Sequence, residues 1–380
     1  MKPPLRILQV CLSGSWGGLE MGASYSVDYF FRRGHFSPCL CRKNSELHWN
    51  LKQKNLPFFA LDLYSRYSPL AVLKIRRLLK QQGIEIVHLH NPRDIWLLSP
   101  AMWGLGRVKL FASSPMLFTR TRKKDPLHRL LYGRLEKMIN LSLPVQKQMQ
   151  KNLPLPPEKH LVIPNPVDLE KFNPEKYDRN HFRDKWGVQP DEILVGLVGR
   201  LDPGKGHREM ILALGEIAKK CPRVKLVVVG RETAGEHTGY ATELKSLARE
   251  SGLEDRIIWA GFTEEIPQVL KSVDIFVMPS YQEAFGLVLI EAMAMRLPVV
   301  ATNAGGAPEI LDYGKCGILI PPRQTAPLAE AVVSLIGNPE LKNKLARAGR
   351  ERVEKVYALD VVLDQLEDLY YGSLNIPKRP

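Results

Sequence analysis

Cysteine is scarce in this chain and long apolar runs are missing, which narrows the classes of protein to which it can belong. Only five of the 380 residues are cysteines, an odd and low count for a disulfide-stabilised secreted protein. Cys39 and Cys41 are too close for a structural disulfide within one strand, which favours a reducing cytoplasm. No apolar run approaches the roughly 18 residues of a membrane-spanning helix. The first one, Leu5–Val10, is too brief for a signal peptide and is predicted to be a core strand.

The common motifs for metals and nucleotides are also missing. There is no Cys/His cluster at zinc-site spacing, no Asp-x-Asp for a metal–diphosphate complex and no G-x-G-x-x-G. Gly199–Lys205 fits the G-x-x-x-x-G-K of a phosphate-binding loop, but Gly206 stands where that loop needs Ser or Thr to ligate magnesium. We therefore predict neither a metal nor a cofactor.

The composition is ordinary for a globular protein, but the charge is unevenly spread. At 44% hydrophobic and 25% charged residues, the chain is long enough for two domains. Residues 1–180 contain 29 Lys and Arg against 13 Asp and Glu, a net charge of +16, whereas the whole chain carries +14. The excess is densest from Arg107 to Lys151. Such a surface is either a solubility device or a site for an anionic lipid, phosphorylated glycan or nucleic acid.

Apolar strands alternate with amphipathic helices in both halves, which predicts an α/β fold with parallel sheets. Strands are expected at Leu5–Val10, Phe58–Leu61, Ile84–Leu89 and Val108–Ala112, and then at Ile193–Val198, Val224–Val229, Arg256–Trp259, Asp274–Met278, Val299–Ala301 and Gly317–Ile320. Seven prolines between residues 154 and 190 mark the domain boundary. We predict a first domain over 1–165, a linker over 166–189 and a second domain over 190–359.

Two glutamates eight positions apart, Glu283 and Glu291, form the most informative motif. Glu283 follows a predicted strand, and Glu291 lies about one turn into the helix predicted over Leu287–Arg296. Ligands of open α/β sheets bind beyond the carboxyl ends of the strands, and the N–H groups near Phe285–Val288 at a helix start suit a phosphate. The two acids could accept hydrogen bonds from hydroxyl groups on either side of that phosphate. A phosphate that joins two polyols is the general structure of a nucleotide sugar.

A glycine-rich turn with two cations, Arg200 and Lys205, follows the first strand of the second half. Two fixed cations can neutralise a diphosphate without a metal. The alternative is a plain β–α turn with incidental surface charges.

Together these motifs resemble the retaining nucleotide-sugar glycosyltransferases of family four, which have the GT-B fold. The resemblance covers nearly the whole chain and rests on Gly199-Arg200…Lys205-Gly206, Glu283-x7-Glu291, Pro298–Thr302 and Gly305–Glu309, and less specifically on Gly17–Glu20, His88–Pro92 and Ile163–Asp168. Asn165-Pro166 departs from the commoner Asn-Gly. The resemblance implies two Rossmann-like, doubly wound domains facing each other across a cleft. It also implies a last helix, in about residues 360–380, that crosses back to the first domain.

The resemblance further implies roles for these residues. Arg200 and Lys205 would hold the diphosphate, Glu291 the ribose and Glu283 the donor sugar. Gly17 and Gly18 would let a loop approach the diphosphate closely, unless they form a plain helix-entry turn. The expected donor-binding residues are Gly17, Gly18, Arg200, Lys205, Phe262, Glu283, Phe285, Gly286, Leu287, Val288 and Glu291, and the expected catalytic residues are His90, Glu283, Arg200 and Lys205.

His90 is expected at the carboxyl end of a strand. Alternation along Ile84–His90 places Ile84, Ile86, His88 and His90 on one face. In the family, a histidine in this place contacts the donor sugar, although a structural histidine is the alternative and is favoured for His88. Retention there is attributed to departure and attack on one face, with the leaving phosphate taking the acceptor proton, so we assign no general base.

The acceptor is expected to be an anionic, membrane-associated glycolipid, such as a lipopolysaccharide core or a phosphoinositide, bound by Arg93, Arg120 and Arg122. Peripheral contact with the inner face of the plasma membrane would follow. A soluble sugar or sugar phosphate is the alternative acceptor. A basic nucleic-acid-binding protein should interleave aromatic and basic residues, which Phe111, Phe118 and Tyr132 hardly do, so no nucleic-acid partner is expected. Intact Arg200, Lys205, Glu283 and Glu291 speak against an inactive sugar-binding relative. UDP is the commonest nucleotide of family donors and is the one predicted.

Overall fold

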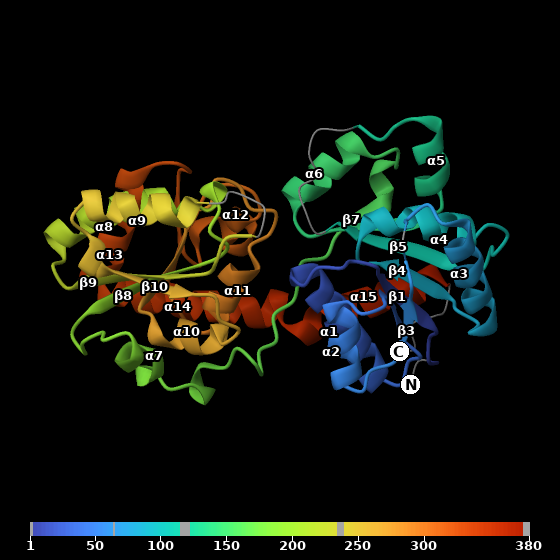
Figure 1. Cartoon of the computed structure of the whole chain (residues 1–380), viewed down its shortest axis with the longest axis horizontal. Coiled ribbons are helices and arrows are strands. Elements are labelled where there is room, and N and C mark those ends of the chain that lie inside the picture. Colours follow the sequence, from blue (N-terminus) through green and yellow to red (C-terminus); the bar gives the residue numbers. More distant parts are fainter. Residues whose placement is uncertain (1–2, 64, 115–121, 234–238, 375–380) are drawn as a thin grey trace. The chain divides into compact units, whose positions relative to one another are not determined.

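The computed structural model describes residues 3–63, 65–114, 122–233 and 239–374, and the chain forms two compact units (Figure 1). Unit 1 comprises Met1–Pro166 and Asp360–Pro380, and unit 2 comprises Val167–Leu359. The segment 166–189, expected to be a linker, is therefore almost entirely part of unit 2. The physical reason is Arg183, a buried residue on α7 (Asn180–Lys185), which donates hydrogen bonds to Ser272 O and Asp274 Oδ2 at 3.2 and 3.1 Å.

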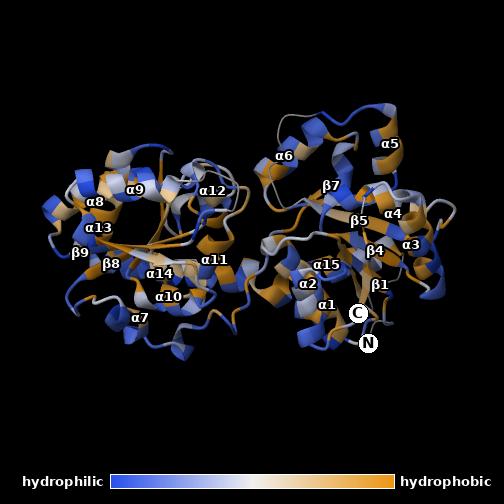
Figure 2. Ribbon diagram, viewed as in Figure 1, coloured by the Kyte–Doolittle hydropathy of each residue, from blue (hydrophilic) through white to orange (hydrophobic). Residues whose placement is uncertain are grey.

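Unit 1 contains a seven-stranded sheet in the order β3-β2-β1-β4-β5-β6-β7, and each neighbouring pair is parallel. Its strands are predominantly apolar (Figure 2). Three of them, β2, β6 and β7, were not among the predicted strands; Glu136 and Lys137 interrupt β6, and β7 has only three residues. The bounds are β1 Ile7–Cys11, β2 Cys39–Arg42, β3 Phe58–Leu61, β4 Ile86–Leu89, β5 Lys109–Ser114, β6 Leu135–Asn140 and β7 His160–Val162.

The helices of unit 1 include one from the far end of the sequence, α15. Tyr29 on α1 donates a hydrogen bond to Asp364 on α15 at 2.6 Å, and Arg33 at the end of α1 forms ion pairs with Asp364 and Glu367 at 2.7 and 2.8 Å. The last helix therefore packs within the first unit. The helices are α1 Gly18–Arg32, α2 Glu46–Gln53, α3 Pro69–Gln81, α4 Ile95–Ala101, α5 Pro126–Gly133, α6 Leu143–Asn152 and α15 Leu359–Ser373.

Unit 2 contains a six-stranded parallel sheet in the order β10-β9-β8-β11-β12-β13. Its core is formed by aliphatic side chains of the strands and of α8, α9 and α13. All six strands were predicted to within two residues at each end. The bounds are β8 Ile193–Val198, β9 Val224–Val229, β10 Ile257–Gly261, β11 Ile275–Met278, β12 Val299–Thr302, β13 Ile318–Ile320, α8 His207–Lys220, α9 Tyr240–Glu250, α10 Ile266–Ser272, α11 Leu287–Ala294, α12 Ala307–Ile310, α13 Thr325–Gly337 and α14 Pro339–Arg352.

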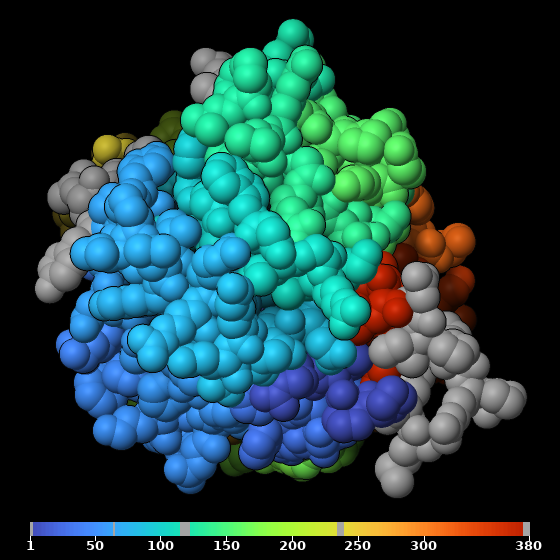
Figure 3. All heavy atoms as spheres, turned by 90° about the vertical axis from the view of Figure 1, so that its right-hand side faces the viewer, coloured from blue at the N-terminus to red at the C-terminus, as the bar shows by residue number. Residues whose placement is uncertain are grey.

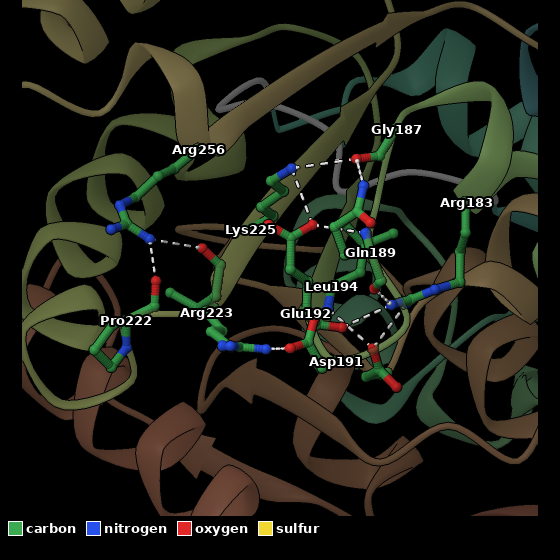
Figure 4. A network of polar contacts seen from close by, with 12 residues as sticks. Arg183, Gly187, Gln189, Asp191, Glu192, Leu194, Pro222, Arg223, Lys225 and Arg256 are labelled. Carbon is green, nitrogen blue, oxygen red and sulfur yellow. Dashed lines mark hydrogen bonds and ion pairs between the residues drawn. The ribbon is translucent and has the colours of Figure 1, made fainter.

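The amino ends of the unit 2 strands are fixed by a polar network (Figure 4). Arg183 donates to the carbonyls of Gln189 and Glu192 at 3.0 and 2.6 Å, and Lys225 forms an ion pair with Glu192 at 3.0 Å. An ion pair also joins Arg223 to Asp191. The network holds the turn before β8 against β9, at the edge of the sheet opposite the carboxyl ends.

The order of the strands reverses once in each sheet. From β1 the chain first builds outward through β2 and β3 and then resumes on the other side with β4. From β8 it builds outward through β9 and β10 and resumes with β11. Loops diverge where the order reverses, and ligands of open α/β sheets bind beyond the strand ends at that place. Each unit therefore has one switch point, between β1 and β4 in unit 1 and between β8 and β11 in unit 2.

None of the described helices is both long enough and apolar enough to cross a membrane.

Candidate functional site

Three loops at the switch point of unit 2 are packed backbone against backbone. Gly206 has φ +74°, and a Cβ there would lie 2.1 Å from the carbonyl oxygen of Pro279, so only glycine fits. Gly305, after β12, has φ +61°, and a Cβ there would lie 1.8 Å from Glu283 O. The Gly306 N–H donates to that same carbonyl at 2.9 Å. The glycines of these loops therefore hold Glu283 in place, a role that the sequence motif alone did not reveal.

An ion pair joins the two charged motifs across this switch point. Lys205 Nζ lies 2.5 Å from Glu283 Oε2, and their side chains are 26% and 20% exposed. Lys205 comes from the turn after β8 and Glu283 from the loop after β11, 78 positions later. The two residues were predicted to contact different parts of a donor, and the structure brings them together.

Helix α11 begins directly after this loop. Gly286, its N-cap, has φ +104°, and the first N–H groups of a helix have no carbonyl within the helix to accept them. The N–H groups of Leu287 and Val288 are therefore donors at the positive end of the helix dipole. The ring of Phe285 is buried and packs against Tyr357, with the ring centroids 5.9 Å apart. Only its backbone is suited to meet a ligand.

Glu291 lies on the first turns of α11, where its carboxyl group is poorly solvated. Burial raises its pKa from 4.5 to about 7, and the positive charge of Lys171 opposes this shift. Within the described parts of the chain, no hydrogen bond to this carboxylate is formed. A carboxylate that is partly shielded from water and has gained no donor is suited to accept hydrogen bonds from a bound hydroxyl pair.

Two arginines and one exposed aromatic ring lie in the segments that follow β8, β9 and β10. The Arg200 guanidinium donates to Thr233 Oγ1 at 3.3 Å, in the segment after β9. Arg231, after the same strand, lies over the ring of Phe262, 4.3 Å from its centroid. Phe262 is 57% exposed.

Sequence reasoning missed a second cluster beside the same loops. The Tyr281 hydroxyl donates to Glu209 Oε1 at 2.7 Å, and Arg323 lies 4.6 Å from the centroid of the Tyr281 ring. The Tyr281 N–H donates to Gly204 O at 2.8 Å, which ties this cluster to the turn that carries Lys205. In the sequence, the position of Tyr281 three residues after the predicted strand was all that indicated a place near the site.

The histidines at the switch point of unit 1 form a neutral network, beside the ion pair of the buried Asp94 with Arg66 at 3.8 Å. His88 and His90 stack with their ring centroids 4.7 Å apart, as the predicted alternation requires. His90 Nε2 lies 2.8 Å from Gln9 Oε1 on β1. Burial lowers the pKa of His90 from 6.5 to about 4, so its ring is neutral near pH 7. The His90 ring can therefore form hydrogen bonds with a ligand, but it contributes no charge to binding.

The remaining residues predicted in unit 1 have plainer surroundings. Gly17 is the N-cap of α1 with an extended backbone, and Gly18 is the first residue of that helix. Neither has the left-handed backbone that requires glycine. Arg93 and Arg122 are exposed, whereas Arg120 lies outside the described residues. Burial lowers the pKa of Lys123, and the charge of Arg93 lowers it further, so the two cations lie near each other.

Among residues 3–63, 65–114, 122–233 and 239–374, no group of three or more His, Cys, Asp and Glu is placed to hold a metal ion.

Comparison with known proteins identifies the class to which this fold belongs. Anabaena HepE, solved in complex with UDP, superposes with a TM-score of 0.84 at 23% identity, over 97% of this chain and 100% of that chain. The parallel sheets and this similarity confirm the predicted architecture, a two-domain Rossmann-like fold of the GT-B type.

Two family models then match in succession along the chain. The family described as Glycosyltransferase Family 4 matches residues 16–171, and Glycosyl transferases group 1 matches residues 178–352. The chain thus belongs to the family-4-type glycosyltransferases, as the motifs predicted.

Two relatives show how far the similarity extends. The GDP-mannose-dependent alpha-(1-6)-phosphatidylinositol monomannoside mannosyltransferase of Mycobacterium tuberculosis is 30% identical over 220 residues, which are 56% of this chain and 55% of that protein. The D-inositol 3-phosphate glycosyltransferase of Saccharomonospora viridis is 30% identical over 213 residues, 55% of this chain and 49% of that protein. The chain thus spans about half the length of the curated relatives it matches.

Proposed function

We propose that this protein is a retaining, metal-independent glycosyltransferase that uses a nucleotide diphosphate sugar. The observation that carries the proposal is the arrangement around the β8–β11 switch point. There the Lys205–Glu283 pair lies on loops fixed by Gly206 and Gly305, and helix α11, with its first turn and the poorly solvated Glu291, follows directly. Cations, backbone donors and two acids in this arrangement suit a diphosphate with a hydroxyl-bearing group on each side.

The chemistry follows from where charge develops. As the bond from the sugar to the phosphate breaks, negative charge grows on the diphosphate, and fixed donors stabilise that state most. Lys205, Arg200 and the N–H groups of Leu287 and Val288 would supply this stabilisation. Glu283 would accept hydrogen bonds from the donor sugar, and Glu291 from the ribose. We assign no protein base, because the leaving phosphate would take the acceptor proton.

A nucleotide-sugar screen tests the donor assignment. Thermal shifts with UDP, GDP and ADP sugars should single out one nucleotide, because a ligand stabilises the state that binds it. The UDP complex of Anabaena HepE supports trying UDP first. Transfer should survive EDTA, and the anomeric configuration of the product should match that of the donor. Complete loss with EDTA, restored by magnesium or manganese, would overturn metal independence, and an inverted product would overturn retention.

For the acceptor, we propose an anionic glycolipid at a cytoplasmic membrane surface. The net charge of +16 on residues 1–180 supports this, as does the acceptor in the name of the mycobacterial mannosyltransferase. A third support is a set of exposed apolar side chains in the same unit. Helices α3, α4 and α5 follow one another on unit 1 (Figure 3), and six large side chains on these helices or just beside them are exposed, which are Tyr67, Leu70, Leu73, Trp103, Leu127 and Leu130.

Liposome sedimentation tests the membrane contact. Each basic residue near an anionic surface contributes on the order of 1 kcal/mol, and the effect fades within about 8 Å at physiological salt. Anionic vesicles, but not zwitterionic ones, should bind the protein. Salt should weaken the binding, and so should changing Arg122, Lys123 and Lys124 to Ser. Changing Lys219 and Lys220 of unit 2 to Ser is the control.

The opposite results favour the alternative acceptors. If the protein ignores anionic vesicles at low salt, a soluble sugar or sugar phosphate becomes the better acceptor, in keeping with the name of the Saccharomonospora relative.

A further inference from the structure

Tyr281 contacts the segment that carries Lys205 on both sides of that lysine. Its N–H donates to Gly204 O at 2.8 Å, directly before Lys205, and its hydroxyl donates to Glu209 Oε1 at 2.7 Å, four positions after it. Two residues beyond Tyr281, Glu283 Oε2 lies 2.5 Å from Lys205 Nζ. The loop after β11 therefore holds the turn after β8 and the start of α8 through three contacts, namely a backbone hydrogen bond, a phenol and an ion pair.

The phenol contact is made to a carboxylate that has few other partners. Within the described residues, Glu209 Oε2 is buried and has no hydrogen-bond partner, so the Tyr281 hydroxyl is the one donor found for this group. Burial, together with the charge of Glu209, raises the pKa of Tyr281 to about 12, and the phenol therefore keeps its proton near pH 7. Arg323 covers one face of the Tyr281 ring, 4.6 Å from its centroid. Removing the hydroxyl would leave the carboxylate without a donor, which is costly for a partly buried charge.

The three contacts differ in whether they would survive the binding of a diphosphate. The ion pair would not, because a diphosphate competes with Glu283 for the Lys205 ammonium group. The backbone hydrogen bond and the phenol contact involve no group that a diphosphate would recruit. We infer that Tyr281 is a positioning residue for Lys205, because its bond to Glu209 holds the first turn of α8 in place while the ammonium group changes partner. The role in diphosphate binding rests on the proposed function, whereas the position of the ammonium group does not.

The test removes the hydroxyl and keeps the ring. Tyr281→Phe should weaken the binding of UDP, or of GDP if the protein prefers it, about three- to tenfold, the size of one ordinary hydrogen bond. Binding of the nucleoside alone, uridine or guanosine, should not change, because Lys205 would contact only the phosphates. Tyr371→Phe is the matched control, since it removes a hydroxyl that donates to Pro3 O at 2.6 Å in unit 1. It should leave both affinities unchanged in calorimetry.

Further variants show whether Tyr281 acts through Lys205. In a Lys205→Ala background, Tyr281→Phe should cause no further loss of diphosphate binding, because the group that it positions is gone. Glu209→Leu should reproduce the effect of Tyr281→Phe, whereas Glu209→Gln keeps an acceptor oxygen for the phenol and should lose less. An undiminished loss in the Lys205→Ala background, or an equal loss of nucleoside binding, would overturn the inference.

A readout without nucleotide separates this role from the proposed function. The side-chain NMR signal of Lys205, identified by its disappearance in Lys205→Ala, should shift in Tyr281→Phe and stay in place in Tyr371→Phe. If the wild-type protein binds no nucleoside diphosphate, the proposed function fails, yet the Lys205 signal still decides whether Tyr281 positions the ammonium group. A signal that Tyr281→Phe leaves unchanged shows that it does not.

Discussion

The switch points of the two units differ in the kind of interaction that builds them. In unit 2, charged groups from distant parts of the chain meet, with Lys205 on Glu283 and Glu291 held in a poorly solvated position. In unit 1, the corresponding strand ends carry one ion pair, Asp94 with Arg66, beside a neutral histidine network in which the pKa of His90 is lowered to about 4. The same topology therefore supports an ionic site in unit 2 and, around the histidines of unit 1, a hydrogen-bonding network.

The difference agrees with two separate binding roles, a diphosphate in unit 2 and a sugar in unit 1. A diphosphate carries charge that must be balanced, and the positive groups of unit 2 can balance it. A sugar carries hydroxyls that need donors and acceptors in fixed directions, which neutral buried side chains provide at low cost. We therefore expect substitutions at the unit 2 site to change activity by altering its charge. Substitutions around the unit 1 histidines should instead change the geometry of hydrogen bonds to the sugar.

The largest expected effect is the loss of the cation at the unit 2 switch point. Lys205→Ala should lower kcat/KM by about a hundredfold or more, the scale of losing one strong transition-state contact. Lys219→Ala, which removes an equal but exposed charge from the far end of α8, should leave kcat/KM unchanged. Steady-state kinetics on both variants measure this. A loss below about fivefold for Lys205→Ala would mean that the diphosphate is held elsewhere.

The next effect is steric. Gly206→Ala requires a left-handed backbone and places a Cβ 2.1 Å from Pro279 O, so the free energy of unfolding should fall by at least about 2 kcal/mol. At Gly199, on the same turn, a Cβ would meet no atom within 4 Å, and Gly199→Ala should melt close to the wild type. Equal melting temperatures for the two variants would show that the loops yield, contrary to the close packing described.

The same contrast explains which features the sequence could predict. The strands of unit 2 are apolar runs bounded by glycine, proline and charge, so their positions were found to within two residues. In unit 1, Glu136 and Lys137 interrupt β6, and its pattern no longer indicates a strand. Alternation also placed His88 and His90 on one face, because it depends only on neighbouring residues.

The partners of these residues were not predictable. Glu283 is 78 positions from Lys205 and Tyr370 is 282 from His88, and no local pattern encodes pairings at such separations. Spacing identified the candidate residues of the site, but only the packed loops and helices show which of them meet.

Glu291 is expected to link stability to pH. Its folded pKa of about 7 exceeds the ordinary 4.5, so the folded state holds the proton more tightly. The associated stability is fully present below pH 4.5 and is lost as the pH rises through 7. Glu291→Gln is neutral at every pH and should be more stable than the wild type by about 1–3 kcal/mol at pH 8, with no difference near pH 4.5.

The same variant should weaken nucleotide diphosphate binding about tenfold at pH 8, because a ribose hydroxyl loses a charged partner. Denaturant titrations and calorimetry at both pH values measure the two effects. Glu340→Gln, an exposed site on α14, is the control. A stability gain that persists at pH 4.5 would show that ionisation is not its cause.

The smallest expected effect separates the two glutamates. Glu283 pairs with Lys205, so Glu283→Gln removes a competitor for that cation rather than a contact to the diphosphate. Calorimetry with the bare nucleoside diphosphate should give an affinity that is unchanged or up to about threefold tighter, since part-exposed ion pairs contribute about 0.2–1 kcal/mol. Transfer should nevertheless slow, because the donor sugar loses its acceptor. If Glu283→Gln weakened the bare diphosphate as much as Glu291→Gln does, the carboxylate would belong to the nucleotide site, and its assignment to the sugar would be wrong.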